Sequence, residues 1–167
     1  MPQQRSAGIL LYRWRASALE VLLGHPGGPY WARKDVGAWM VPKGAVEPGE
    51  QASEAAVREF EEEVGPLPPG KPVPLMTVRQ NGGKLVEVFA LEGNFDPLAL
   101  SSNEFELEWP PRSGRIKRFP ELDKVRWMGM AEARRRILAS QQPLLAALEE
   151  QLAGPPRDGE EQGPGQR

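Results

Sequence analysis

Three glutamates in one short segment have the type and spacing needed to bind a metal ion. Glu59, Glu62 and Glu63 lie at positions i, i+3 and i+4, so on an α-helix their carboxylates share one face within a single turn. Like charges at this spacing repel, and acids in a last turn also oppose the helix dipole, each at roughly a few tenths of a kcal/mol. A cation between them would remove this cost, whereas a solvated acidic helix is the alternative interpretation.

The ligand type narrows the choice of ion. Grouped carboxylates are hard oxygen ligands, which suit Mg²⁺ or Mn²⁺ rather than metals that prefer soft ligands. The chain contains no cysteine, which excludes disulfides and thiolate metal sites. The sequence therefore predicts an oxygen-ligated magnesium or manganese site on this segment.

The segment that carries the three acids has the pattern of an amphipathic helix. It runs from Gln51 to Val64, after a Gly/Pro-rich turn and before a stop at Gly65 and Pro66. An apolar stripe suited to packing on a sheet consists of Ala56, Val57, Phe60 and Val64. The side expected to face solvent consists of Gln51, Glu54, Arg58 and Glu61. The acidic face lies between these two sectors.

The spacing around these acids resembles the signature of the Nudix hydrolases. Gly44 is followed after five residues by Glu50, and after seven more by the run Arg58-Glu59-Phe60-x-Glu62-Glu63-x-Gly65. Two positions depart from the family pattern, because Phe60 replaces an aliphatic residue and Pro66 occupies the following apolar position. Neither departure touches a position that the pattern assigns as a ligand.

The resemblance implies hydrolysis of a phosphoanhydride bond with a divalent metal ion. It also implies that the three glutamates are metal ligands, with the backbone carbonyl of Gly44 completing the set. A glycine suits this position because it allows the main chain to come close to an ion. Arg58 and Glu50 resemble partners that join the turn to the helix through an ion pair.

Members of this family usually draw another acid from outside the helix, as an added ligand or as the base. The resemblance favours Glu121, which lies just before the last predicted strand. The alternatives are Glu104, Glu106 and Glu108, which alternate along another predicted strand.

The remaining chain predicts a mixed sheet with helices packed on it, an α+β pattern. Strands are expected at 6–14, 19–24, 39–41, 72–80, 84–92, 104–109 and 124–128, and further helices at 131–138 and 143–152. Residues 110–119 are expected to form a loop. This organisation agrees with the α/β/α sandwich that the resemblance implies, with the catalytic helix against the sheet. We expect one domain over 1–153 and a disordered tail over 154–167, which is rich in Gly, Pro, Gln and Glu.

Two predicted loops and one lysine are candidates for substrate binding. Residues 25–39 carry Tyr30, Trp31, Arg33 and Lys34, whose aromatic faces and cations can contact bases and phosphates. The predicted loop 110–119 carries Arg112, Arg115, Lys117 and Arg118, and arginine suits bidentate phosphate contacts. Both loops can also be ordinary ordered or solvated surface. Lys43 belongs to a run that is similar to hydrolases of diadenosine polyphosphates, where this lysine lies beside the phosphate chain.

The expected substrate is a dinucleoside polyphosphate or a nucleoside triphosphate. The alternatives are an RNA 5′-pyrophosphohydrolase, a diphosphoinositol polyphosphate hydrolase and a non-catalytic, nucleotide-sensing module of the same fold. A net charge of −2 gives no overall field for nucleic acid or membranes, so nucleic acid is expected only as a capped or triphosphorylated RNA end. Without a signal peptide or a long apolar run, the expected location is the cytoplasm, as a monomer or a homodimer.

Overall fold

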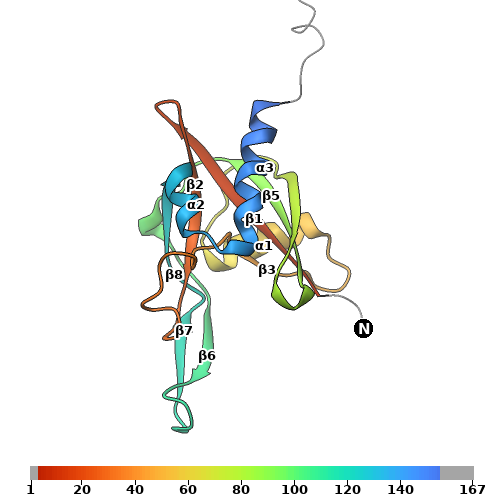
Figure 1. Cartoon of the computed structure of the whole chain (residues 1–167). Coiled ribbons are helices and arrows are strands. Elements are labelled where there is room, and N and C mark those ends of the chain that lie inside the picture. The colour runs from red at the N-terminus through yellow and green to blue at the C-terminus, as the bar shows by residue number, and fades with distance from the viewer. Residues whose placement is uncertain (1–3, 155–167) are drawn as a thin grey trace, which may run out of the picture.

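The computed structural model describes residues 4–154 and is built around a mixed six-stranded sheet (Figure 1). Its strands follow the order β4-β5-β1-β2-β8, and β3 pairs with β1 beside β2. Only the β1–β5 pair is parallel, and the other neighbours are antiparallel. The strands are β1 (Arg5–Arg15), β2 (Ala18–Pro26), β3 (Lys43–Ala45), β4 (Val73–Arg79), β5 (Leu85–Glu92) and β8 (Leu122–Gly129).

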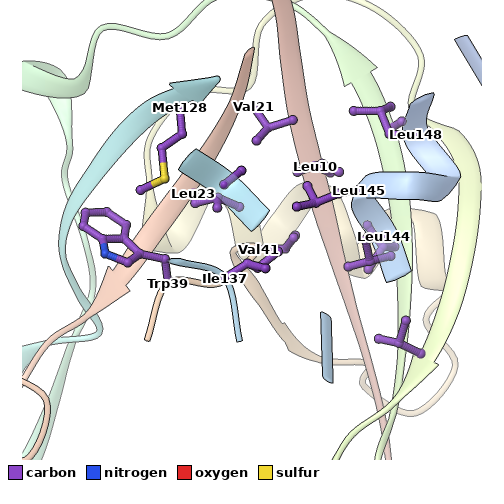
Figure 2. Close-up of a cluster of buried hydrophobic side chains, with 14 of the residues drawn as sticks. Leu10, Val21, Leu23, Trp39, Val41, Met128, Ile137, Leu144, Leu145 and Leu148 are labelled. Atoms are coloured by element: carbon purple, nitrogen blue, oxygen red, sulfur yellow. The ribbon is translucent and has the colours of Figure 1, made fainter. Parts of the chain in front are cut away.

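Helices cover both faces of this sheet because successive side chains of its central strands point to opposite sides. Ile9 and Leu11 of β1 pack with the helix α1 (Ala52–Glu63) in one core. Leu10 lies in the other core, which includes side chains of α2 (Met130–Arg136) and α3 (Gln142–Ala153) (Figure 2). The α+β class and the α/β/α sandwich predicted from the sequence are therefore confirmed.

A two-stranded hairpin projects from the body of the protein (Figure 1). It consists of β6 (Glu104–Glu108) and β7 (Ile116–Pro120), and we call residues 104–120 the arm. The prediction of a loop over 110–119 is wrong in its second half, since β7 begins at Ile116. This strand forms because it pairs with β6, and Arg118 bonds to Glu104 and Glu106 across the pair.

The short strand predicted at 39–41 is also wrong. Trp39 and Met40 form only isolated bridges, and the paired strand β3 begins after Pro42, at Lys43. Proline has no backbone N–H to donate to a strand ladder, which explains why the strand begins only after Pro42. The predicted tail falls, apart from Gly154, outside the described residues. Among the residues that the structure describes, no helix has the length and apolar character needed to span a bilayer.

Candidate active site

Helix α1 carries the three glutamates, and its local sequence fixes where it starts and stops. The backbone N–H of Gln51 donates to the Glu54 side chain at 3.1 Å, which caps the first turn. Buried Phe60 and Val64 hold the helix on the sheet, as the apolar stripe predicts. Gly65 follows with a φ of +147°, which favours glycine at the helix exit. The acids therefore lie on a helix whose position is set by the core.

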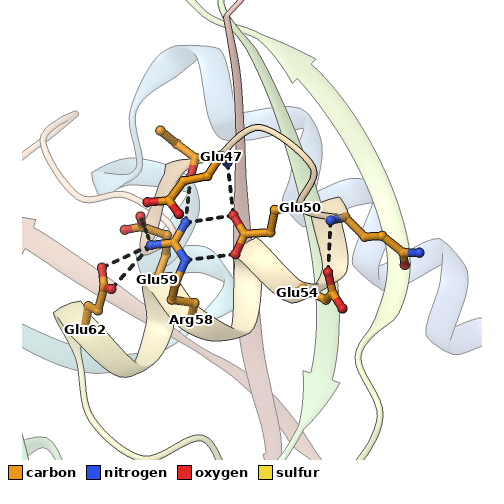
Figure 3. A network of polar contacts seen from close by, with 8 residues as sticks. Glu47, Glu50, Glu54, Arg58, Glu59 and Glu62 are labelled. Carbon is orange, nitrogen blue, oxygen red and sulfur yellow. Dashed lines mark hydrogen bonds and ion pairs between the residues drawn. The ribbon is translucent and has the colours of Figure 1, made fainter.

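Arg58 is the centre of the polar network on this helix (Figure 3). It donates to both carboxylate oxygens of Glu50, at 2.9 and 3.0 Å, and to the backbone carbonyl of Ala45 at 2.8 Å. It also donates to Glu59 at 2.9 Å and to Glu62 at 3.3 Å. The Arg58 guanidinium, together with the backbone N–H of Glu47, holds the pKa of Glu50 down to about 2. The ion pair that the sequence predicts between Arg58 and Glu50 is present and joins the turn to the helix.

Within residues 4–154, no three acidic or histidine side chains stand ready to hold a metal ion. Glu59 and Glu62 instead share the Arg58 guanidinium. The donors still fit a hard divalent ion, since all are oxygens. A Cβ placed on Gly44 would lie 1.9 Å from Oε1 of Glu59, so only glycine leaves room for this carboxylate against the main chain. The residues thus fit a divalent ion when Glu59 and Glu62 bind the ion in place of the Arg58 guanidinium.

Glu63, Glu121 and Lys43 form one electrostatically coupled group beside this network. Burial raises the pKa of Glu63 to about 8, and the charge on Glu121 adds to the rise. Burial also raises the pKa of Glu121, while the Lys43 ammonium opposes that rise. Burial lowers the pKa of Lys43, and the charge on Glu63 opposes that decrease. Glu121 therefore lies in the neighbourhood expected for the further acid, and its catalytic role stays a prediction.

Backbone hydrogen bonds place Glu121 beside the helix. Its N–H donates to the carbonyl of Asn103 at 2.8 Å, and the N–H of Asn103 donates to the carbonyl of Glu62 at 2.9 Å. The alternative acids point elsewhere: Glu104 and Glu106 pair with Arg118, and Glu108 accepts from the Gly114 N–H. All three are exposed on the arm.

Raising the pH is expected to destabilise the metal-free protein. Because the folded state raises the pKa of Glu63 from 4.5 to about 8, it holds this proton more tightly than the unfolded chain does. The stabilisation is complete below the unfolded pKa and is lost as the pH rises through about 8. Thermal unfolding in EDTA from pH 5 to 9 measures this, and Glu63→Gln should flatten the profile. An equally steep profile in that variant contradicts the assignment.

The predicted substrate-binding residues fall into two places. Tyr30 is 57% exposed and packs edge-on against Trp109 of the arm. The Lys34 Nζ lies 5.1 Å from the centroid of the Trp31 ring. Arg33, between them in sequence, is exposed. The structure places Arg112 and Arg115 at the tip of the arm rather than beside the glutamates.

The loop that carries Tyr30 to Lys34 is anchored by buried His25. Its Nδ1 lies 2.9 Å from the Asp123 carboxylate, and its Nε2 lies 2.6 Å from the backbone carbonyl of Lys34. The end of the loop is held by Asp35, which accepts from Trp39 and pairs with Arg136. The loop is therefore fixed at both ends of its aromatic and cationic segment.

A cavity of about 700 Å³ opens beside Gly44, and sequence reasoning missed two of its cations. Lys43 and Lys84 line it together, and Arg5 lies at its edge with Glu87 as partner. The charge of Lys84 acts on Lys43. Glu47 and Glu50 also line the cavity, and Glu50 is paired with Arg58, so Lys43 and Lys84 supply the positive charge of the cavity next to the glutamate face. The only sequence signal for Lys84 is its position directly after the Asn81-Gly82-Gly83 turn.

The comparison with protein families decides the family of this chain. A model described as the NUDIX domain matches residues 2–148. The chain belongs to the NUDIX domain family. The resemblance drawn from the spacing of Gly44, Glu50 and the α1 acids is thereby confirmed at the level of the family.

Relatives of this Nudix chain differ in the substrates or ligands that are named for them. It is 42% identical over 57 residues to an RNA pyrophosphohydrolase of Erythrobacter litoralis, a match covering 32% of this chain and 35% of the relative. The chain thus spans about a third of that relative's length. The structure is similar to the NUDIX domain of Shewanella oneidensis NrtR complexed with ADP ribose, with 18% identity, a TM-score of 0.65, and coverage of 91% and 90%. It is also similar to a C. elegans Ap4A hydrolase binary complex, with 24% identity, a TM-score of 0.63, and coverage of 89% and 98%. At these identities both structures show a shared fold.

Proposed function

We propose that this chain hydrolyses a phosphoanhydride bond in a compound linked to a nucleoside diphosphate, with Mg²⁺ or Mn²⁺ as cofactor. The observation that carries the proposal is the row of Glu59, Glu62 and Glu63 on α1, with Glu59 packed against Gly44. Three coupled carboxylates have little structural use, because burial and mutual repulsion already raise the pKa of Glu63. They make chemical sense as ligands that neutralise phosphoryl oxygens through a shared ion.

Each residue of the site has a part in this proposal. The three glutamates and the Gly44 carbonyl would hold the ion, which when bound withdraws charge from the phosphoryl group and lowers the pKa of a bound water. Arg58 holds Glu50 and the Ala45 carbonyl, and so keeps the turn against the helix. Glu121 would act as a further ligand or as the base that takes a proton from the attacking water.

The substrate is a dinucleoside polyphosphate or a nucleoside triphosphate in this proposal. The cavity of about 700 Å³ beside Gly44 supports it, because the ammonium groups of Lys43 and Lys84 suit a chain of several phosphates. Similarity in fold to an Ap4A hydrolase agrees with a substrate of this size. Tyr30, Trp31, Arg33 and Lys34, in the loop anchored by His25, would supply aromatic and cationic contacts.

A second candidate substrate is the 5′ end of an RNA. The relative named as an RNA pyrophosphohydrolase is 42% identical to a 57-residue part of this chain, and exposed Arg112 and Arg115 suit further phosphates. The chemistry at the metal would be the same, because a 5′-triphosphate also presents a phosphoanhydride. Only the part of the substrate beyond the reacting phosphates differs.

Turnover of three compounds tests the proposal. ATP, diadenosine tetraphosphate and a 5′-triphosphorylated RNA of ten nucleotides are incubated with the full chain, in Mg²⁺, Mn²⁺ or EDTA, and products are separated by anion exchange. We expect metal-dependent release of mononucleotide or pyrophosphate from at least one compound. Nucleotide binding without turnover in either metal contradicts the proposal and supports a non-catalytic module.

A further inference from the structure

The arm separates aromatic and acidic side chains onto opposite faces. Cross-strand partners of an antiparallel pair lie on the same face of the sheet. The pairs Phe105–Phe119 and Leu107–Lys117 thus share one face, and the backbone bond between Trp109 and Arg115 continues that register. We call these six residues the aromatic face. Three glutamates with Arg118, Ile116 and Pro120 occupy the other face.

The two faces differ in charge as well as in shape. The aromatic face carries Lys117 and Arg115 and no carboxylate. Neither cation forms an ion pair within the described part of the chain, whereas Arg118 on the opposite face pairs with Glu104 and Glu106. A hairpin that needed only to be soluble would have no reason to sort its charges in this way. An aromatic surface with unpaired cations is the combination that binds nucleotides by stacking and by phosphate contact.

The loop anchored by His25 packs on this face and extends it. A Cβ on Gly28 would lie 3.0 Å from the Phe105 ring, so the main chain here rests on that ring. The Tyr30 and Trp109 rings meet edge to face, with centroids 5.2 Å apart and an interplanar angle of 79°. More than half of the Tyr30 side chain stays exposed. A flat ring can therefore stack on Tyr30, on the side of the arm that carries Lys117 and Arg115.

The aromatic face is joined to the active site by main-chain hydrogen bonds. The N–H of Gly27 donates to the carbonyl of Glu121 at 3.0 Å, and the base of the arm is bonded to Glu62 through Asn103. These bonds attach the base of the arm and the start of the loop directly to Glu62 and Glu121, which places the arm next to the site of the proposed reaction.

The spacing along the arm argues against the idea that these cations merely balance the acids near α1. At about 3.3 Å per residue of extended chain, the Cα atoms of Lys117 and Arg115 are about 13 and 20 Å from that of Glu121. Exposed charges are largely screened beyond about 8 to 10 Å in physiological salt. The two cations are therefore suited to a part of the substrate that lies beyond the reacting phosphates.

We propose that the aromatic face and Tyr30 bind a nucleoside of the substrate, with its base stacked on Tyr30, whose ring Trp109 holds edge-on, and its phosphate met by Lys117 and Arg115. This rests on the proposed function and specifies its substrate as one with a nucleotide beyond the hydrolysed bond. That nucleotide is either the second nucleoside of a dinucleoside polyphosphate or the next residue of an RNA 5′ end. The two sources share one chemistry, an aromatic base with an anionic linker.

The test compares variants of the arm on the same three compounds. Trp109→Ala and the double variant Arg115→Ala/Lys117→Ala are expected to lower kcat/KM by about tenfold or more on diadenosine tetraphosphate or on the RNA, since stacking and phosphate contacts are lost. The double variant removes exposed side chains without ion pairs, so its fold is not at risk. The compound whose kcat/KM falls more shows whether the bound nucleoside comes from a dinucleoside polyphosphate or from an RNA 5′ end.

Arg135→Ala is the control for the cations. It removes one positive charge from α2, at an exposed arginine without an ion pair in the described part of the chain, and its kcat/KM is expected to change less than twofold. Losses below twofold in Trp109→Ala and in the double variant would overturn the proposal, as would an equal loss in Arg135→Ala. If the wild-type protein hydrolyses none of the compounds, the proposed function fails by itself. Equilibrium binding of the same compounds in EDTA then tests the arm with the same variants and the same criteria.

Discussion

Replacing Glu63 with glutamine is expected to lower the turnover of any nucleotide substrate by about three orders of magnitude. Glutamine keeps the size of the side chain but cannot supply the anionic oxygen that a hard divalent ion prefers. An ion that stabilises transition-state charge contributes several kcal/mol, and about 4 kcal/mol corresponds to a factor of about a thousand in rate. Steady-state kinetics in saturating Mg²⁺, together with calorimetric titration of Mn²⁺, measures both the rate and the affinity for the ion.

The matched control lies two residues earlier on the same helix. Glu61 is exposed and belongs to the solvated side of α1, so Glu61→Gln removes the same charge without touching the site. Its kcat is expected to stay within a factor of about two. Similar losses in both variants would mean that the general negative charge of the helix matters and not a ligand at position 63. A Glu63→Gln protein that still binds Mn²⁺ tightly would exclude Glu63 as a ligand.

Helix α1 could be predicted because its signals are local. The apolar stripe with Phe60 and Val64, and the stop at Gly65, fix its period and its end within one short segment. The spacing from Gly44 to Glu63 similarly lies within a single run of the chain, and the family comparison confirms the family that this spacing indicates. Local patterns of this kind survive folding because the helix docks as one unit on the sheet.

Contacts between distant segments explain what the sequence analysis missed. Residues 116–120 form a strand only because β6 lies beside them and because Arg118 finds Glu104 and Glu106 there. The cavity cation Lys84 follows a turn after β4, and Arg5 comes from the start of β1. Nothing within either segment indicates that the sheet brings it close to Lys43.

Arg58 shows how a helical wheel can misplace a residue. The wheel groups it with Glu54 and Glu61 on the solvated side, yet the side chain is 27% exposed and bonded to three carboxylates. Its long side chain bends back over the helix to reach the turn that contains Glu50. A wheel records the direction of Cβ and not the reach of a flexible side chain.

Replacing Arg58 with methionine is expected to destabilise the metal-free protein by about 2 kcal/mol, less than for a fully buried pair because the network is partly solvated. Methionine keeps much of the packing but leaves Glu50, Glu59 and Glu62 without their shared cation. The turn also loses its bond at the Ala45 carbonyl, so Gly44 is held less firmly and kcat/KM should fall about 10- to 100-fold. Urea unfolding in EDTA and steady-state kinetics in Mg²⁺ measure the two effects.

Two opposing effects of Arg58 on the ion make this variant informative. Arg58 competes with a metal for Glu59 and Glu62, so its removal frees two carboxylates, but it also fixes the turn that carries Gly44. We expect positioning to dominate, because Arg58 binds Glu50 through both oxygens, and Mg²⁺ should restore part of the lost stability by replacing the missing charge. Arg135→Met, at an exposed arginine of α2, should leave stability and kinetics unchanged. A gain in activity for Arg58→Met would show instead that Arg58 acts mainly as a competitor of the metal.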